Sequence, residues 1–267
     1  MVRGPARRSV LRRFATRWDF IVLARAAAVT LLALALAWLI AALSEDGIGW
    51  GERAGHALPF APLCGAIGVC GALGPVRARG EAGALEALGR TPGQVGAAAV
   101  AGATIATIAC AVVIGLVPAV DVAGFYPTAR HASTWHFVDG RFEDSVRGLR
   151  IGPEGAPERL VTTAPEPKVR SWAIARPERA AASLATAFAA LALSLIAARM
   201  LLVSPAQSSR KEVLRGHLVD AAACGLAIAS SAVLFQVAAA RHAPALSAAA
   251  PMFLLLGFSV KRYRDLS

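Results

Sequence analysis

Six long apolar stretches constrain this chain more than any other feature of its sequence. Most of them approach the roughly 20 residues that an α-helix needs to cross a bilayer. They run over residues 20–43, 57–76, 95–120, 180–203, 217–240 and 246–260. The last is short and contains Pro251, so we expect its helix to begin near Ala243, to tilt, or to kink at the proline. Together the stretches predict six transmembrane helices.

The composition agrees with a membrane protein. Of the 267 residues, 56% are hydrophobic and only 17% are charged, and the mean hydropathy is +0.55. A soluble domain of this length is rarely so apolar, whereas a multi-spanning membrane protein commonly is. We therefore predict a mainly α-helical, polytopic membrane protein.

The positive charge is confined to one side of the predicted topology. With the N-terminus inside, the inner segments hold 17 of the 28 Lys and Arg residues but only six of the 17 Asp and Glu residues. The outer segments balance, so the whole net charge of +11 lies inside, as the positive-inside rule expects. Nucleic-acid binding is not needed to explain the basicity, and both termini are expected in the cytoplasm.

The leader "ARRSVLRRF" resembles a twin-arginine export signal. The apolar stretch after it is longer than the apolar core of a cleavable signal, which favours an uncleaved anchor.

The third outer segment, 121–177, is much longer than the other connections and divides the chain. It contains runs typical of strands, namely "STWHFV", "RFEDSV", "RLVTT" and "VRSWAIA". Asp139-Gly140, between the first two runs, is a hairpin turn signal. We expect a small periplasmic β domain of three or four strands that packs on the membrane part or on a partner. The predicted organisation is therefore a three-span half over 1–120, this domain over 121–177, and a second three-span half over 178–267.

The residues that usually carry chemistry form no recognisable site. The four cysteines lie inside predicted spans, and the five histidines show no metal-ligand spacing. No Ser/His/Asp or Cys/His grouping and no G-x-x-x-x-G-K-[ST] phosphate loop occurs. We expect no catalytic residue, metal or cofactor, and any ATP hydrolysis would belong to a partner chain. Arg25 and Arg199, near the inner boundaries, are expected to snorkel toward the membrane surface.

One inner segment, "RARGEAGALEALGRTPGQV" at 77–95, combines a helical pattern with start and stop signals. Gly80 can cap the start, and Glu81 suits the positive end of the helix dipole. Ala84, Leu85 and Leu88 are expected to form an apolar strip, with Glu86 and Arg90 turned away. Thr91-Pro92-Gly93 ends the helix. Two interpretations remain open: an ordinary linker helix at the membrane surface, or a coupling helix that docks in a groove of an ATPase.

The segment from Ala57 to about Val113 resembles the LptF/LptG family of lipopolysaccharide-export permeases. In that family a proline-bearing second span precedes a cytoplasmic helix with Glu, then Ala, Gly and Ser/Thr at offsets of +6, +8 and +10. The matching residues here are Pro59 and Pro62 in the span, then Glu81, Ala87, Gly89 and Thr91. The order of three spans, an outer β domain and three spans is also similar, as is the end "HAPALSAAAPMFLLLGFSVKRYRD". In the permeases of adhesion- and macrolide-exporter type, the large outer domain instead precedes the coupling helix.

The resemblance implies a permease subunit of an ABC exporter that extracts a lipid from the bacterial inner membrane. The implied partners are an LptB-like ATPase dimer, a second permease subunit (the same or homologous), possibly a periplasmic bridge protein, and a lipopolysaccharide-like lipid. Spans 1 and 5, or their neighbours, would form a lateral gate with the second permease. The coupling site would lie at about 80–93 and comprise Glu81, Ala84, Leu85, Ala87, Leu88, Gly89 and Thr91.

Two features depart from the family pattern. The family's outer domain is a β-jellyroll more than twice as long as 121–177. The family also places basic residues at the outer end of the first span, where this chain has Ser44, Glu45 and Asp46. Acidic residues there would repel an anionic lipid, so either another lipid is moved or a partner permease supplies the cations. The alternative from another class is a non-transport scaffold or assembly factor that retains the permease fold.

Overall fold

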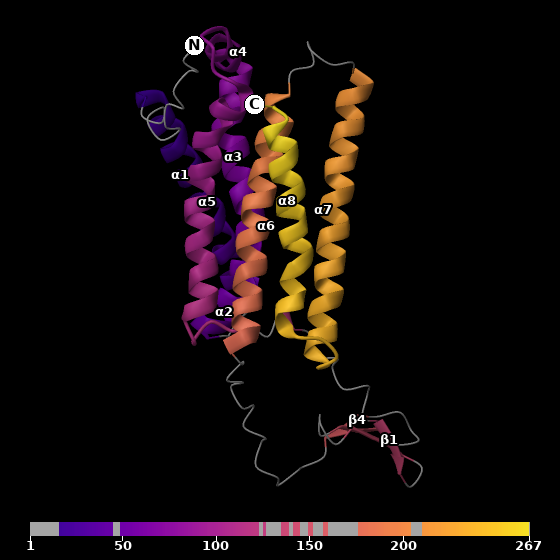
Figure 1. The fold of residues 1–267 in the computed structure, drawn as a ribbon. Helices are drawn as coiled ribbons and strands as arrows, with labels where there is room; N and C mark the ends of the chain where they lie inside the picture. The colour runs from indigo at the N-terminus through magenta and orange to yellow at the C-terminus, as the bar shows by residue number, and fades with distance from the viewer. Residues whose placement is uncertain are drawn as a thin grey trace.

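The protein is seen in a computed structural model that describes residues 16–44, 49–122, 125–126, 135–138, 141–144, 149–151, 157–159, 176–203 and 210–266. These residues form a bundle of long helices and a small sheet (Figure 1). The helices are α1 (Arg17–Ser44), α2 (Trp50–Ala57), η2 (Leu58–Phe60), α3 (Ala61–Ala78), α4 (Glu81–Ala87), α5 (Pro92–Leu116), α6 (Arg176–Leu202), α7 (Arg210–Ala239), η4 (Ala245–Ala249) and α8 (Ala250–Arg264).

The prediction of six long apolar helices is confirmed. In the described part of the chain, six helical segments are long and apolar enough to cross a membrane: Arg17–Leu43, Arg53–Ala78, Pro92–Leu116, Pro177–Leu202, Lys211–Ala239 and Ala245–Arg264. The sixth begins as η4 at Ala245, close to the expected Ala243. Pro251 lies in the first turn of α8 and not in its interior. In the first turn the missing N–H of a proline costs no intrahelical hydrogen bond.

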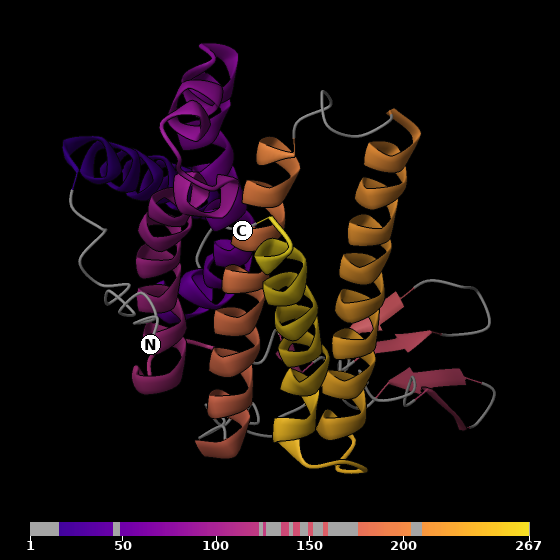
Figure 2. The ribbon, with the colours of Figure 1, turned by 45° about the horizontal axis from the view of Figure 1, so that its top comes forward.

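The bundle has two large apolar cores that share α6, and a smaller one formed by Ile114, Val122 and Ala182. One core joins α1, α3, α5 and α6, and includes Val22, Val69, Val95 and Leu195. The other joins α6, α7, η4 and α8, and includes Ala192 and Phe235. α7 packs mainly on α8 and η4 and only lightly on α6, and Figures 1 and 2 both show α8 lying between α6 and α7.

Small residues allow close helix packing, as is common in membrane bundles. A Cβ at Gly68 of α3 would collide with the Thr30 hydroxyl of α1, and one at Gly102 of α5 would collide with the backbone of Leu23. The Thr30 hydroxyl itself donates to Ala26 O, one turn back in α1, at 2.8 Å. Such hydroxyls are satisfied within their own helix and leave its surface smooth for packing.

Four short strands follow α5: β1 (Trp135–Val138), β2 (Arg141–Asp144), β3 (Leu149–Ile151) and β4 (Pro157–Arg159). They pair antiparallel in the order β1-β2-β3-β4. Val138, the last residue of β1, lies opposite Arg141, the first residue of β2. The expected Asp139-Gly140 turn and the run "VRSWAIA" lie outside the described residues. Strands of three or four residues do not establish the expected β-rich domain.

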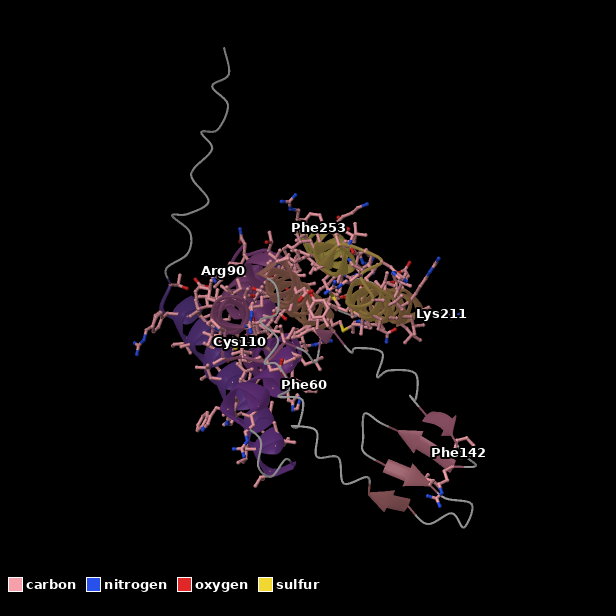
Figure 3. The ribbon with its side chains drawn as sticks, turned by 90° about the horizontal axis from the view of Figure 1, so that it is seen from below. Phe60, Arg90, Cys110, Phe142, Lys211 and Phe253 are labelled. Carbon is pink, nitrogen blue, oxygen red and sulfur yellow. The ribbon has the colours of Figure 1, made fainter. Side chains whose placement is uncertain are left out.

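The two ends of the bundle differ in what they carry. α4, the start of α1 and the end of α8 share one end, whereas the sheet follows α5 beyond the other end (Figure 1). Viewed from the sheet side, Phe142 on β2 lies away from the helices, and Phe253 and Lys211 lie on the α8 and α7 side of the bundle (Figure 3). The predicted docking helix and the sheet are therefore at opposite ends.

Candidate docking site at α4

α4 is a short helix that projects from the bundle end between α3 and α5 (Figures 1 and 2). Gly80 is its N-cap residue, as the sequence predicts, and its φ of 72° is a left-handed value that glycine adopts without strain. The Gly80 N–H donates to Arg77 O at 3.0 Å, so the chain reverses sharply after α3. This turn sets the direction in which α4 leaves the bundle.

The end of α4 is a Schellman motif centred on Gly89. Gly89 has a φ of 85°, its N–H donates to Glu86 O at 2.8 Å, and the Arg90 N–H donates to Leu85 O at 3.1 Å. These bonds satisfy carbonyls that the end of a helix leaves without intrahelical partners. The glycine is needed here because a side chain is disfavoured at positive φ.

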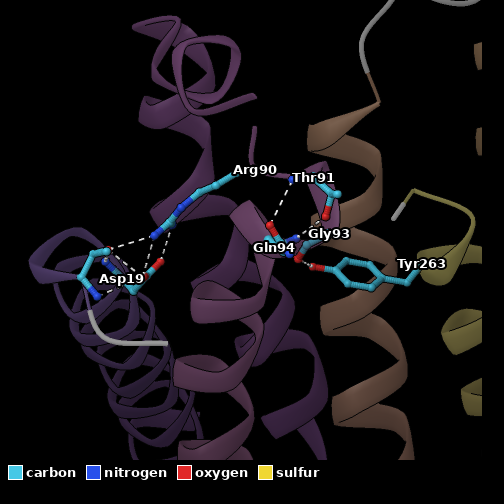
Figure 4. Close-up of polar contacts among 7 residues, drawn as sticks. Asp19, Arg90, Thr91, Gly93, Gln94 and Tyr263 are labelled. Atoms are coloured by element: carbon cyan, nitrogen blue, oxygen red, sulfur yellow. Dashed lines mark hydrogen bonds and ion pairs between the residues drawn. The ribbon is translucent and has the colours of Figure 1, made fainter. Parts of the chain in front are cut away.

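α5 begins immediately afterwards with a capping box. The Thr91 hydroxyl accepts from the Gln94 N–H at 3.3 Å, and the Thr91 N–H donates to Gln94 Oε1 at 3.2 Å (Figure 4). Pro92 occupies the first turn of α5. Gly89 and Thr91, two residues of the predicted site, thus define the joint between α4 and α5 rather than offering side chains to a partner.

The predicted apolar strip of α4 is divided between two faces. Leu85 is half-buried and, with Ala82, packs against the core formed by α1, α3, α5 and α6. Ala84 and Ala87 are exposed, and Leu88 is 82% exposed. The expectation of one continuous strip that includes Leu85 is therefore wrong, and the free apolar face consists of Ala84, Ala87 and Leu88.

Glu81 lies at the start of α4 and is paired within its own loop. Arg79 Nε is 3.1 Å from Glu81 Oε1, and the two side chains are 59% and 37% exposed. An exposed pair of this kind is worth little, about 0–1 kcal/mol, so Glu81 can exchange partners at small cost.

The sequence predicts that Arg90 turns away from the apolar strip, and in the structure its side chain lies against the start of α1. Its guanidinium donates to both carboxylate oxygens of Asp19 on α1, at 2.8 and 3.0 Å, and to Thr16 Oγ1 at 3.1 Å (Figure 4). It also lies over the Trp18 ring, 5.6 Å from the ring centroid. The hydrogen bonds to Asp19 raise the pKa of Arg90 above its usual value. Glu86, which the sequence also predicts to turn away from the strip, is half-buried.

A second contact anchors the start of α5 to α8. The Tyr263 hydroxyl donates to Gly93 O at 2.7 Å, across 170 positions of sequence (Figure 4). The connection from α4 to α5 is thus held on one side by α1, through Arg90, and on the other by α8. Sequence patterns gave no signal for either contact.

Arg199, expected to snorkel, instead joins a buried ion-pair cluster near the same end. Arg199 donates to the carboxylate of Asp220 on α7, and this aspartate is completely buried. Arg262 Nε of α8 donates to the other oxygen of the same carboxylate at 3.3 Å. Two guanidinium groups on one carboxylate compensate the cost of burying its charge. Arg25 is exposed and remains compatible with snorkelling.

A cavity of about 290 Å³ lies toward the other end of the bundle, between η2, α3, α6, α7 and α8. Its walls are mainly apolar, with three polar side chains among them: Thr186, Ser231 and Gln236. All four cysteines are free thiols on α3, α5 and α7. Among the described residues, no cluster of His, Cys, Asp and Glu side chains could hold a metal ion.

The chain was compared with family models, curated proteins and solved structures. None of the three comparisons finds a match. The proposed assignment therefore depends on the residues and geometry described above.

Proposed function

We propose that this chain is a permease subunit of an ABC exporter of LptF/LptG type, which extracts a lipid from the inner membrane using a separate ATPase. The observation that carries the proposal is the exposed apolar face of α4, formed by Ala84, Ala87 and Leu88. This face lies on a helix whose two ends are fixed to the bundle.

The size of the face suits a docking contact. Fully burying a leucine side chain is worth about 1.5–3 kcal/mol, and Leu88 is almost fully available for burial. Arg79 and Glu81 lie at the N-terminal end of the same helix and can pair with charged residues at the edge of a groove on the ATPase. An apolar face with a charged margin also suits the bilayer surface, so docking on a protein is tested against contact with lipid.

The anchoring of α4 supports a role in transmitting force. Gly80, the Schellman motif at Gly89 and the Thr91 capping box leave little freedom between α4 and its two flanking spans. Arg90 and Tyr263 then tie the joint to α1 and α8. A simple linker would not need this number of tertiary contacts.

The sidedness of the proposal follows from charge. All the net positive charge falls on the α4 side of the predicted topology, which supports a cytoplasmic position for α4 and both termini and a periplasmic one for β1–β4. A periplasmic bridge protein would then meet the chain on the side of β1–β4.

The membrane-facing surfaces suit a second permease and a lipid substrate. α1 and α7, the first and fifth spans, contain the smallest shares of buried residues among the six. The apolar cavity beside α7 could receive part of a lipid chain. A second permease could cover α1 and α7 and form a lateral gate.

The test is to purify the tagged chain from the membranes of its own host and to identify the bound proteins and lipids by mass spectrometry. The proposal predicts a stoichiometric ATPase subunit that is lost in Leu88→Asp and retained in Leu214→Asp. Leu214 is a matched control because it is also exposed, on the first turns of α7. If both variants retain the ATPase, the proposal is contradicted.

The alternative is a scaffold or assembly factor that retains the permease fold without transport. The short sheet favours it, because the described residues of 121–177 show strands of only three or four residues. The purification distinguishes the two, since a scaffold predicts other membrane proteins in place of an ATPase.

A further inference from the structure

Tyr263 occupies a slot that α5 leaves open for it. A Cβ at Gly96 would lie 2.6 Å from the Tyr263 hydroxyl and 2.7 Å from Leu202 Cδ1, so only glycine leaves room for both side chains. One turn earlier, Gly93 O accepts the hydrogen bond from that hydroxyl at 2.7 Å. The first turn of α5 is therefore tied specifically to α8.

The residue next to Tyr263 ties α8 to α7. Arg262 donates from Nε to Asp220 Oδ1 and from Nη2 to Gly216 O, each at 3.3 Å. Arg199 of α6 donates to the same carboxylate. Because Asp220 is fully buried, its charge would be left uncompensated in an apolar environment if both guanidiniums were lost.

Along most of its length, α7 depends on α8 and η4 for packing. Its buried residues form a single stripe of Asp220, Ala227, Ser231, Phe235 and Ala238, within which Phe235 also packs on Phe125 and Tyr126. The Ser231 hydroxyl donates to Ala248 O of η4 at 2.8 Å. α7 packs more extensively on α8 and η4 than on α6, to which the Arg199–Asp220 pair also joins it, so a movement of α8 relative to α6 would act on α7.

We propose that Tyr263 is the positioning residue through which a displacement of the α4–α5 joint reaches α8 and, through Arg262 and Asp220, α7. The cavity beside α7 would change shape as a result, since α7 forms one of its walls. This inference rests on the proposed function, because a docked ATPase is what would displace α4.

Tyr263→Phe isolates this role. It keeps the ring and removes only the hydroxyl, which lies against Gly96 and donates to Gly93. Tyr126→Phe is a matched control, because the Tyr126 hydroxyl also donates to a backbone carbonyl of another element, Glu178 O at 2.8 Å, at the opposite end of the bundle. Burial raises the pKa of the Tyr126 phenol, so the group stays protonated as a donor.

The experiment uses the permease with its co-purified ATPase in nanodiscs. Spin labels are placed at Leu63→Cys on α3 and Val233→Cys on α7, both exposed positions, after the four native cysteines are replaced by alanine. The distance between the labels is measured without nucleotide and after trapping with ATP and vanadate, and the ATP hydrolysis rate is measured on the same samples.

We expect the native chain and Tyr126→Phe to show a nucleotide-dependent shift in the label distance. Tyr263→Phe should keep the resting distance, the bound ATPase and its ATP hydrolysis, but lose the shift. A native-like shift in Tyr263→Phe would overturn the inference and leave the proposed function standing. A changed resting distance would show a purely structural role and would also overturn it. If the native chain carries no ATPase, the proposed function fails, and the coupling role fails with it.

Discussion

The pair formed by Arg90 and Asp19 should contribute measurably to stability. Arg90→Ala removes two hydrogen bonds to the carboxylate and one to Thr16, and also the contact with the Trp18 ring. The side chains of Arg90 and Asp19 are 21% and 11% exposed, which places the pair between a surface pair and a buried one. The loss should therefore exceed what an exposed ion pair contributes.

The magnitude follows from what Asp19 retains. Removing one partner of a fully buried pair costs about 3–5 kcal/mol, and an exposed pair contributes about 0.2–1 kcal/mol. After Arg90→Ala, the Thr16 hydroxyl still donates to Asp19 Oδ2 at 2.6 Å, so the carboxylate keeps one good partner. We expect a loss of about 2 kcal/mol in the free energy of unfolding, close to the value of hydrogen bonds to a charged group.

The assay is unfolding of the reconstituted protein by titration with a denaturing detergent. Arg79→Ala is the matched control, because it removes an exposed arginine from a pair with Glu81 near the same helix. The control should change the free energy of unfolding by less than about 1 kcal/mol. Equal effects of Arg90→Ala and Arg79→Ala would refute the assignment of Arg90 as an anchor.

Three further predictions concern α4 and the topology. Gly89→Ala should destabilise the protein by about 1–2 kcal/mol because its φ is left-handed, whereas Gly83→Ala, in open space within α4, should stabilise it by about 0.5–1 kcal/mol; detergent unfolding would show opposite signs. Leu85→Asp should lower the unfolding midpoint because Leu85 packs on the bundle core, whereas Leu88→Asp should leave it within about 0.5 kcal/mol of native. An impermeant thiol reagent applied from the periplasm should label Asp139→Cys and spare Gly83→Cys; the reverse pattern would invert the topology.

The sequence predicts best what neighbouring residues determine. The six spans depend on local length and apolarity, and the position of Gly80 depends on capping rules that operate within a few residues. Each of these features is present in the structure at or near the expected residue. The expected helix end at Thr91-Pro92-Gly93 is wrong, because α4 already ends at Ala87 in the Gly89 turn and Thr91 instead caps α5. The last span is the instructive case, since Pro251 marks the beginning of α8 and not a bend within it.

Contacts between distant segments could not be predicted in the same way. Arg90 meets Asp19 across 71 positions and Tyr263 meets Gly93 across 170, and neither pair forms a local pattern. The helical period of α4 identified its apolar residues but could not say that Leu85 faces the bundle, because that depends on the angle at which α3 and α5 hold the helix. For the same reason Arg199 could not be assigned to a buried pair.

The most direct test of docking at α4 is site-specific photo-crosslinking from position 88 in membranes of the native host. A benzophenone amino acid replaces Leu88 in one variant and Leu214 in the other, and crosslinked proteins are identified by mass spectrometry. If α4 is a coupling helix, position 88 should capture an ATPase subunit with an ABC nucleotide-binding domain, and position 214 should not. Crosslinks from position 88 only to lipid, or to proteins without such a domain, would contradict the assignment of this chain as a permease.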